Sequence, residues 1–526
     1  MNQSRAAVVP VIDLFAGPGG LGEGFSAFNP SSGEPPFRIR LSIEKDPLAH
    51  ATLRLRAFYR QFKCSRVPDD YYELLRGRIK IEDLFKAFPK EAKAARREAW
   101  NATLGVAARG VVNARIRQAL DGSDRWVLIG GPPCQAYSVA GRARNSGIKT
   151  YKAEDDHRQY LYVEYLQVIA DHWPAVFIME NVKGLLSANL NDRRLFQRII
   201  DDLGAPHEAL LRQGRSIESS KRQHSYRVVP LAPQTDGEAI EVTDYVVAAE
   251  KHGVPQARHR LILVGIRDDL GGVALPPIPE SDEVTVGQVL DDLPRLRSGL
   301  SEKDSVDRWL TLLMTVPERR WLMSAGRNGG ANIQELIVRT ALNLAPPKRD
   351  RGSPFIKGEF VPEYQPKWYN DPRLDGICHH ETRSHLDSDL HRYLFVSAYG
   401  HVHGRSPTLK DFPADLLPAH GNVESAVKNG GFFSDRFRVQ LHGKPASTVT
   451  SHIAKDGHYY IHPDPSQCRS LTLREAARLQ TFPDNYFFCG PRTKGYGQVG
   501  NAVPPLLARN IASSVWTLLT KSGAAK

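Results

Sequence analysis

Apolar residues in the first half of the chain occur either in short continuous runs or at helical spacing. The short runs are rich in β-branched side chains, which predicts buried strands at residues 8–15, 39–44, 126–131, 175–181 and 260–267. Helical spacing between them predicts amphipathic helices at residues 47–62, 160–172 and 193–203. Strands that alternate with helices predict an α/β fold with a mostly parallel sheet covered on both faces.

Two stretches depart from this alternation. Residues 86–120 are rich in Ala, Lys and Arg, which predicts an inserted helical segment. Residues 268–440 carry many prolines, glycines, histidines and aromatics without a steady period, which predicts a second domain that is mixed and loop-rich. Helical spacing returns at residues 473–481 and 504–519.

Composition narrows the partners and the compartment. A chain of 526 residues is too long for one compact core, and its net charge of +12 suits a polyanionic partner such as nucleic acid. Five unevenly spaced cysteines do not suggest a disulfide framework, which fits a reducing compartment. Without an uninterrupted apolar segment for a membrane or a signal peptide, we expect a cytoplasmic protein.

A glycine-rich turn follows the first predicted strand, at residues 13–20 with the sequence DLFAGPGG. Glycines at such a turn let a ligand approach the backbone, and the helix beyond offers free N–H groups. Glu44 ends the second predicted strand, where an acidic side chain could bind ribose hydroxyls. An ordinary tight turn and a solvated surface glutamate are the alternatives for these two features.

Three further motifs lie at the carboxyl ends of predicted strands. Two prolines stiffen the backbone immediately before Cys134, which predicts a thiol presented in a fixed place among polar residues. Glu180 leaves the buried strand at residues 175–181 and would meet the same ligand. Arg258 and Arg260 occupy alternate positions and would share one face of an extended strand, although each could instead be a solvent-facing cation.

In content and order these motifs resemble the DNA (cytosine-5) methyltransferase family of bacterial type. The resemblance covers residues 8–267 and 444–515 and rests on Phe15-Ala16-Gly17, Pro133-Cys134-Gln135, Glu180-Asn181-Val182, Gln256 to Arg260, Arg469 to Glu475 and Gly497 to Val503. It implies a Rossmann-like S-adenosylmethionine-dependent methyltransferase domain formed by residues 1–267 and 444–526. Residues 268–443 would form an inserted target-recognition domain.

The resemblance also implies a mechanism on carbon 5 of cytosine. The Cys134 thiolate would add to carbon 6 of a cytosine flipped out of the duplex. Glu180 would hydrogen-bond N3 and the exocyclic amine, Arg260 would contact the base and hold Glu180, and Arg258 would support the site. Pro133, Gln135, Ser138 and Asn181 would steady the base and its backbone, and residues 141–157 would close over it.

By the same resemblance, S-adenosylmethionine would bind at the glycine-rich turn and leave as S-adenosylhomocysteine. The residues expected to hold it are Phe15, Gly17, Gly19, Glu44, Asp83, Leu161, Asn501, Ala502 and Val503. Asp83 would meet the adenine amino group, although the small residue that usually precedes the acid in this family is absent. No metal is expected.

Double-stranded DNA is the expected partner, read as a monomer, and a cognate restriction endonuclease could act on the same sequence. Two alternatives stay open: a tRNA methyltransferase on the same scaffold, which the long insertion disfavours, and a catalytically silent DNA-binding protein, which the intact motifs disfavour. A zinc site is a third alternative for the cluster of Cys378, His379, His380, His385, His391, His401 and His403. It is disfavoured because structural zinc sites usually hold several cysteines.

Overall fold

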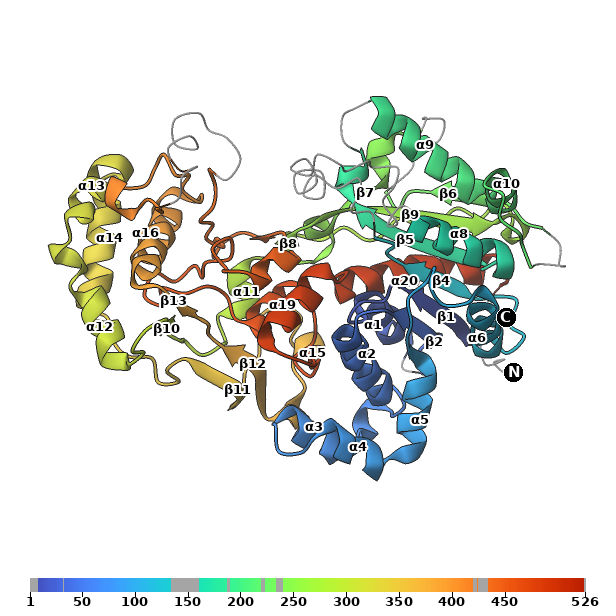
Figure 1. The fold of residues 1–526 in the computed structure, drawn as a ribbon, viewed down its shortest axis with the longest axis horizontal. Coiled ribbons are helices and arrows are strands. Elements are labelled where there is room, and N and C mark those ends of the chain that lie inside the picture. Colours follow the sequence, from blue (N-terminus) through green and yellow to red (C-terminus); the bar gives the residue numbers. More distant parts are fainter. Residues whose placement is uncertain are drawn as a thin grey trace.

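The computed structural model describes residues 8–31, 33–133, 160–186, 190–218, 223–232, 240–419, 423 and 434–524. Its centre is a sheet with the strand order β3-β2-β1-β4-β5-β9-β6, in which β7 also pairs with β9 (Figure 1). These strands are β1 (Val9–Leu14), β2 (Phe37–Glu44), β3 (Ala99–Asn101), β4 (Val127–Gly130), β5 (Val176–Val182), β6 (Tyr226–Val229), β7 (Val246–Ala248) and β9 (His259–Arg267).

The sheet is mostly parallel, as the alternation of strands and helices predicts. Strands β3, β2, β1, β4 and β5 run parallel to one another, and β9 runs antiparallel to β5, β6 and β7. All six residues of β1 are buried, because helices cover both faces of the sheet. This explains why the strands read as continuous apolar runs rather than as alternating ones.

Different parts of the chain supply the two helical layers. One face packs against α1 (Gly20–Ala27) and α20 (Pro505–Lys521), which come from opposite ends of the sequence. The other face packs against α6 (Arg109–Leu120), α8 (Tyr160–His172), α9 (Leu190–Gly204) and α10 (Pro206–Arg212). One face of the sheet is therefore fully covered only when α20, the last helix of the chain, packs against it.

The segment at residues 86–120 corrects the prediction of a purely helical insertion. It contains α5 (Pro89–Glu98) and α6, but between them β3 extends the central sheet, pairing Ser42 with Ala99 and Glu44 with Asn101. A strand of three residues is too short to show an alternating pattern, which is why the sequence did not reveal it. With α2 (Pro47–Tyr59), α3 (Asp69–Leu75) and α4 (Ile81–Ala87), helix α5 forms a separate small core.

The second half of the chain is more helical than its composition predicts. Helices α12 (Val306–Met314), α13 (Arg320–Gly329), α14 (Ala331–Leu342) and α16 (Asp387–His403) share one core at the end of the molecule away from the sheet (Figure 1). Short paired strands lie between this core and the sheet: β11 (Gly352–Lys357) with β12 (Gly376–Glu381), β10 (Gly299–Leu300) with β13 (Ser384–His385), and β8 (Gln256–Ala257) with β14 (Ala446–Ser447).

A further core combines residues of the segments 284–377 and 446–502. Helices α18 (Leu473–Leu479) and α19 (Arg492–Asn501) pack with α11 (Val286–Leu290), α15 (Pro366–Tyr369) and β12, and only α20 reaches the central sheet. A division at residue 444 therefore does not coincide with a boundary between cores. Among the helices that the structure describes, none is both long and apolar enough to cross a lipid bilayer.

Helices α1 and α20 approach so closely that Gly24 has no room for a side chain. A Cβ built on Gly24 would lie 2.4 Å from the Ala508 Cβ and 2.4 Å from the Pro505 carbonyl oxygen. Because backbone atoms of α20 form part of this contact, a side chain at residue 24 would push the two helices apart.

We therefore expect Gly24→Ala to lower the free energy of unfolding by about 1–3 kcal/mol, as overpacking of a core does. Gly110→Ala is the matched control, because a Cβ on that helical glycine meets no atom within 4 Å. Urea unfolding followed by circular dichroism measures both variants. Equal stability of the two would contradict the close α1–α20 contact.

Candidate active site

The candidate site lies where the parallel strands β1, β4 and β5 end. Strand β1 leads into the glycine-rich turn, β4 leads into Gly131 to Pro133, and Glu180 and Asn181 lie in the last three residues of β5. The carboxyl ends of parallel strands meet at one edge of the sheet, where α/β proteins bind their ligands. Cys134, Gln135, Ser138 and the expected closing loop at residues 141–157 lie outside the described residues.

The glycine-rich turn has an unusual backbone. Phe15, Gly17 and Gly19 have positive φ values of 57°, 58° and 100°, which favour glycine at the last two positions. A Cβ built on Gly17 meets no described atom within 4 Å, so the turn is open there, whereas one on Gly19 would lie 2.8 Å from Leu53. The backbone of the turn is thus open at Gly17, where a ligand can contact it, and closely packed at Gly19, which holds the turn in place.

Glu44 is fixed beside this turn. Its Oε2 accepts a hydrogen bond from the Gly17 N–H at 2.8 Å, and its Oε1 accepts one from the Asp46 N–H at 2.7 Å. Asp46 in turn caps α2, accepting hydrogen bonds from two backbone N–H groups of the first turn. Glu44 is therefore held at the strand end, and the solvated-glutamate alternative does not describe it.

Asp83 does not join this group. It is exposed on α4, where its carboxylate accepts a 3.4 Å hydrogen bond from the Lys80 N–H and helps to cap its own helix. The position next to Glu44 in the sheet is taken by Asn101, whose amide donates to the carbonyls of Glu44 and Lys45. Sequence reasoning missed Asn101 because β3 could not be recognised.

The C-terminal motif reaches the glycine-rich turn through the backbone of Val503. A Cβ on Gly20 would lie 2.2 Å from the Val503 carbonyl oxygen, so α1 begins directly against this residue. Ala502 and Val503 are buried, and Asn501 is exposed at the end of α19. Leu161 is half-buried in the first turn of α8. The Tyr486 hydroxyl, which sequence reasoning missed, donates to the Pro18 carbonyl and further anchors the turn.

Glu180 and Arg260 form an ion pair at the end of β5. The Arg260 Nε lies 3.1 Å from the Glu180 Oε1, and the two side chains are 13% and 15% exposed. The other carboxylate oxygen lies close to Gly131, where a Cβ would be 2.9 Å from Oε2. Because Gly131 lacks a side chain, the carboxylate can approach the segment that leads through the half-buried Pro133 into Cys134.

Asn181 fixes the same segment from the other side. Its amide donates to the Pro132 carbonyl at 3.3 Å, and its side-chain oxygen accepts from the Val182 N–H at 2.8 Å. The structure therefore brings Glu180, Asn181, Arg260 and the residues before Cys134 to one place.

Arg258 has a different role from Arg260. It is 2% exposed, and its guanidinium donates to the carbonyls of Val449 at 2.8 Å, Ala502 at 2.8 Å and Gly500 at 3.4 Å. Burial and the nearby Arg260 lower the pKa of Arg258 to about 9, and Glu180 opposes this shift. Arg258 was expected to support the site, and its hydrogen bonds to backbone carbonyls hold the C-terminal motif in place.

Gln256 completes this connection. Its amide donates to the Leu479 carbonyl at 3.0 Å and to the Gln480 side chain at 2.6 Å, and its oxygen accepts from the Val449 N–H at 2.7 Å. Strand β8, the segment after β14 and the end of α18 are thus joined by buried hydrogen bonds.

The histidines and the cysteine considered as zinc ligands have separate partners. The buried Cys378 thiol donates to the Leu75 carbonyl, and burial raises its pKa to about 12. His379 accepts from the Phe488 N–H, and His380 contacts the Thr472 hydroxyl and the Pro294 carbonyl. Among the residues that the structure describes, no three of this cluster have ligand atoms close enough to share an ion.

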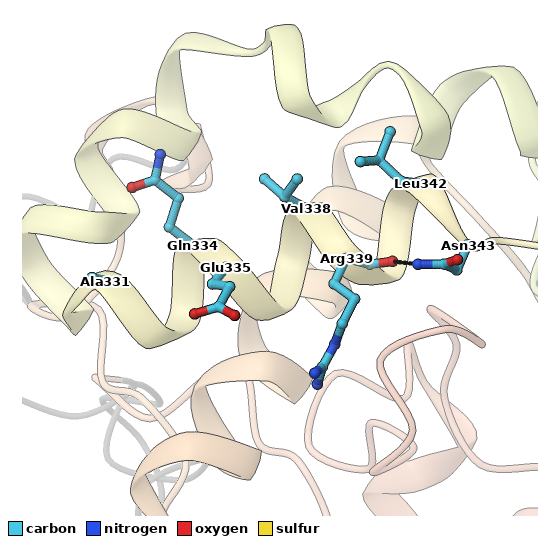
Figure 2. A pocket seen from close by; sticks show the side chains of 7 residues that line it. All are labelled: Ala331, Gln334, Glu335, Val338, Arg339, Leu342 and Asn343. Atoms are coloured by element: carbon cyan, nitrogen blue, oxygen red, sulfur yellow. Dashed lines mark hydrogen bonds between the residues drawn. The ribbon is translucent and has the colours of Figure 1, made fainter.

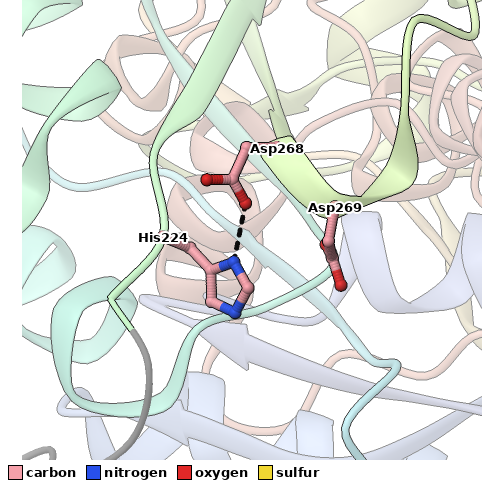
Figure 3. A group of neighbouring side chains, drawn as sticks. All are labelled: His224, Asp268 and Asp269. Atoms are coloured by element: carbon pink, nitrogen blue, oxygen red, sulfur yellow. Dashed lines mark hydrogen bonds and ion pairs between the residues drawn. The ribbon is translucent and has the colours of Figure 1, made fainter.

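Among the described residues, His224, Asp268 and Asp269 are the group whose ligand atoms lie close enough to share a metal ion (Figure 3). Asp268 already pairs with His224 at 2.6 Å, and Asp269 accepts two hydrogen bonds from Arg267. The Arg267 guanidinium therefore already balances the charge of Asp269.

A hollow of about 560 Å³ lies on the outer face of α14 (Figure 2). Its lining residues, among them Gln334, Val338 and Leu342, come from α14 and Asn343 just beyond it. None belongs to the strand ends, so this hollow is no part of the candidate active site.

Comparisons with known proteins agree on one family. The family model of the C-5 cytosine-specific DNA methylase matches residues 112–205 and 240–516. The Type II methyltransferase M.Bpa9945I of Bacillus paralicheniformis is 30% identical over 96% of this chain and 98% of its own length. The DNA (cytosine-5-)-methyltransferase M.ApeKI of Aeropyrum pernix is 26% identical over 76% of this chain and 83% of its own.

The Type II methyltransferase M1.HphI of Haemophilus parahaemolyticus is 26% identical over 75% of this chain and 69% of its own. The family model spans the ends of β4 and β5, the two arginines and the C-terminal motif, which are the parts that the structure brings together at the candidate site. The chain belongs to the C-5 cytosine-specific DNA methylase family and is a DNA (cytosine-5) methyltransferase of bacterial type.

Proposed function

We propose that this enzyme transfers a methyl group from S-adenosylmethionine to carbon 5 of a cytosine flipped out of duplex DNA, through a covalent bond between Cys134 and carbon 6. The observation that carries the proposal is the Glu180–Arg260 ion pair, set against Gly131 in the segment that leads into Cys134. Attack on a pyrimidine ring requires a nucleophile, a carboxylate and a cation close to one another. Cys134, Glu180 and Arg260 are the groups that we propose for these roles at this edge of the sheet.

The residues at this edge divide the chemistry between them. The Cys134 thiolate forms a bond to carbon 6, and the electron pair of the 5,6 double bond moves into the ring toward N3. Glu180 hydrogen-bonds N3 and the exocyclic amine, where negative charge would otherwise build up. Carbon 5 is then nucleophilic and gains the methyl group. The proton on carbon 5 passes to solvent water, its electron pair re-forms the 5,6 double bond, and the bond from carbon 6 to the thiolate breaks.

The glycine-rich turn fits the methyl donor. S-adenosylmethionine supplies an electrophilic methyl group on its sulfonium and leaves as S-adenosylhomocysteine. The open backbone at Gly17 would admit its methionine part, Phe15 would lie against the adenine, and the fixed Glu44 carboxylate would accept hydrogen bonds from the ribose hydroxyls. We assign the remaining contacts to Gly19, Leu161 and the motif Asn501 to Val503, and we assign the adenine edge to Asn101 in place of Asp83.

DNA would lie between the strand ends and the helical core of α12, α13, α14 and α16. Gln135 and Ser138 would steady the extruded nucleotide, and the target sequence would be read by a recognition domain within residues 268–443. Since the named relatives are Type II methyltransferases, we infer a cognate restriction endonuclease. We further propose that the enzyme acts as a monomer, because one catalytic site and one recognition domain suffice, and that it lies with its DNA substrate in the cytoplasm.

Cys134→Ala tests the covalent step. We expect it to abolish methylation of duplex DNA while leaving the thermal midpoint unchanged, because the thiol is the group that bonds to carbon 6. Duplex DNA with 5-fluorocytosine at the target should trap the unaltered enzyme, since fluorine at carbon 5 cannot leave as the proton does. Mass spectrometry detects the adduct.

The matched control is Cys489→Ala, which removes a half-buried thiol outside the site. This variant should still methylate DNA and still form the adduct. Turnover by Cys134→Ala, or an adduct at another residue, would overturn the nucleophile assignment.

The two arginines should respond differently to substitution. Arg258→Gln leaves buried carbonyls without their donor and should lower the free energy of unfolding by about 2–4 kcal/mol. Arg260→Gln breaks a partly exposed ion pair and should cost at most about 1 kcal/mol, but it should lower kcat about 100-fold. Thermal unfolding and steady-state kinetics measure the two effects. Equal destabilisation by both substitutions would contradict the different roles assigned to Arg258 and Arg260.

A further inference from the structure

A basic hollow of about 610 Å³ lies between α2, α4 and α5, away from the ion pair of the active site. We define this basic hollow by the cationic residues Arg54, Lys86, Lys93 and Arg96, with His50 and Glu82 beside them. It precedes residue 112, where the match to the family model begins. Three cations of the segment at residues 86–120 therefore line a hollow that includes none of the residues assigned to methyl transfer.

The spacing of the cations explains how they converge. On α5, Lys93 and Arg96 lie three positions apart and share one face of the helix, and on α2 His50 and Arg54 lie four positions apart. Lys86 comes from the last turn of α4. Three helices thus direct positive side chains to one hollow.

These charges are not neutralised within the described part of the chain. No ion pair there involves Arg54, Lys86, Lys93 or Arg96, and Glu82 is the one carboxylate that lines the hollow. By contrast, the neighbouring Arg60 pairs with Glu98 on the buried side of α5. The cations of the hollow are therefore available to a ligand.

Arg54 is the most constrained of them. Its guanidinium lies over the Phe85 ring at 4.4 Å, and its Nε is buried without a hydrogen-bond partner among the described residues. Burial, together with the charge of Arg96, lowers the pKa of Arg54. A buried donor left unpaired beside a like charge is costly, and an anion in the hollow would relieve both the lost hydrogen bond and the repulsion.

We propose that the basic hollow is a second binding site, for a ligand that carries phosphate groups. Arginine and lysine are the side chains that proteins use for phosphate, and the volume lies in the range of small-molecule sites. The same chemistry is offered by a soluble phosphorylated compound and by the backbone of DNA outside the recognition sequence. The experiment below separates these two sources.

The first arm measures binding of inorganic pyrophosphate to the full-length enzyme by calorimetry at constant ionic strength. The double variant Lys93→Gln/Arg96→Gln should weaken the Kd at least tenfold, because it removes two charge-assisted contacts. The matched control is Lys90→Gln/Arg97→Gln, which removes the same charge from exposed positions of α5 that do not line the hollow.

The control should bind pyrophosphate like the unaltered enzyme, and both double variants should keep its thermal midpoint. If the unaltered enzyme does not bind pyrophosphate, or if both variants lose affinity equally, the proposal is overturned.

The second arm identifies the source of the phosphate. The salt dependence of binding is compared for a duplex that covers only the recognition sequence and for one extended on both sides. If the ligand is the DNA backbone, Lys93→Gln/Arg96→Gln should reduce the slope of log K against log salt by about 2 on the extended duplex alone. An unchanged slope, together with lost pyrophosphate binding, assigns the site to a soluble ligand.

Discussion

The buried guanidinium of Arg258 joins parts of the chain that are far apart in sequence. Its hydrogen bonds reach carbonyls 191 and 244 residues further along, in the segment after β14 and in the motif before α20. Because Val503 lies against the first residue of α1, the position of the glycine-rich turn depends on where this motif is held. The site at the sheet edge is therefore complete only when the C-terminal motif packs against the start of α1 and accepts the hydrogen bonds of Arg258.

Burial distinguishes two arginines that lie two positions apart in the sequence. Arg260 keeps part of its surface exposed and pairs with Glu180, so it can meet a ligand at the strand end. Arg258 is enclosed and donates to backbone carbonyls, so it can act only through the segments it holds. A similar contrast distinguishes the paired Arg60 from the unpaired cations of the basic hollow.

Five strands of the central sheet (β1, β2, β4, β5 and β9) could be predicted to within a few residues, because burial on both faces makes them mostly continuous apolar runs. The short strands β3, β6 and β7, and with β3 the position of Asn101, could not be predicted, because three or four residues carry no period. In the second half, the helices around Trp309 and Tyr393 lie between segments rich in proline and glycine, which hid their spacing.

Among the site residues, the motifs at Gly17, Glu44 and Glu180 could be placed at one sheet edge from the sequence alone, because each follows a recognisable strand. The different roles of Arg258 and Arg260 came from the family resemblance and not from the residue pattern, since alternate positions on a strand reveal a shared face but not what covers it. Asp83 was assigned from the order of the motifs alone. Because a long segment lies between β2 and β3, the residue beside Glu44 in the sheet is Asn101 instead.

Transfer of a labelled methyl group from S-adenosylmethionine to unmethylated duplex DNA, followed by bisulfite sequencing, tests the central claim most directly. The account predicts 5-methylcytosine confined to one short sequence, with no label in tRNA. Label in tRNA alone, or methylated DNA without 5-methylcytosine, would contradict it.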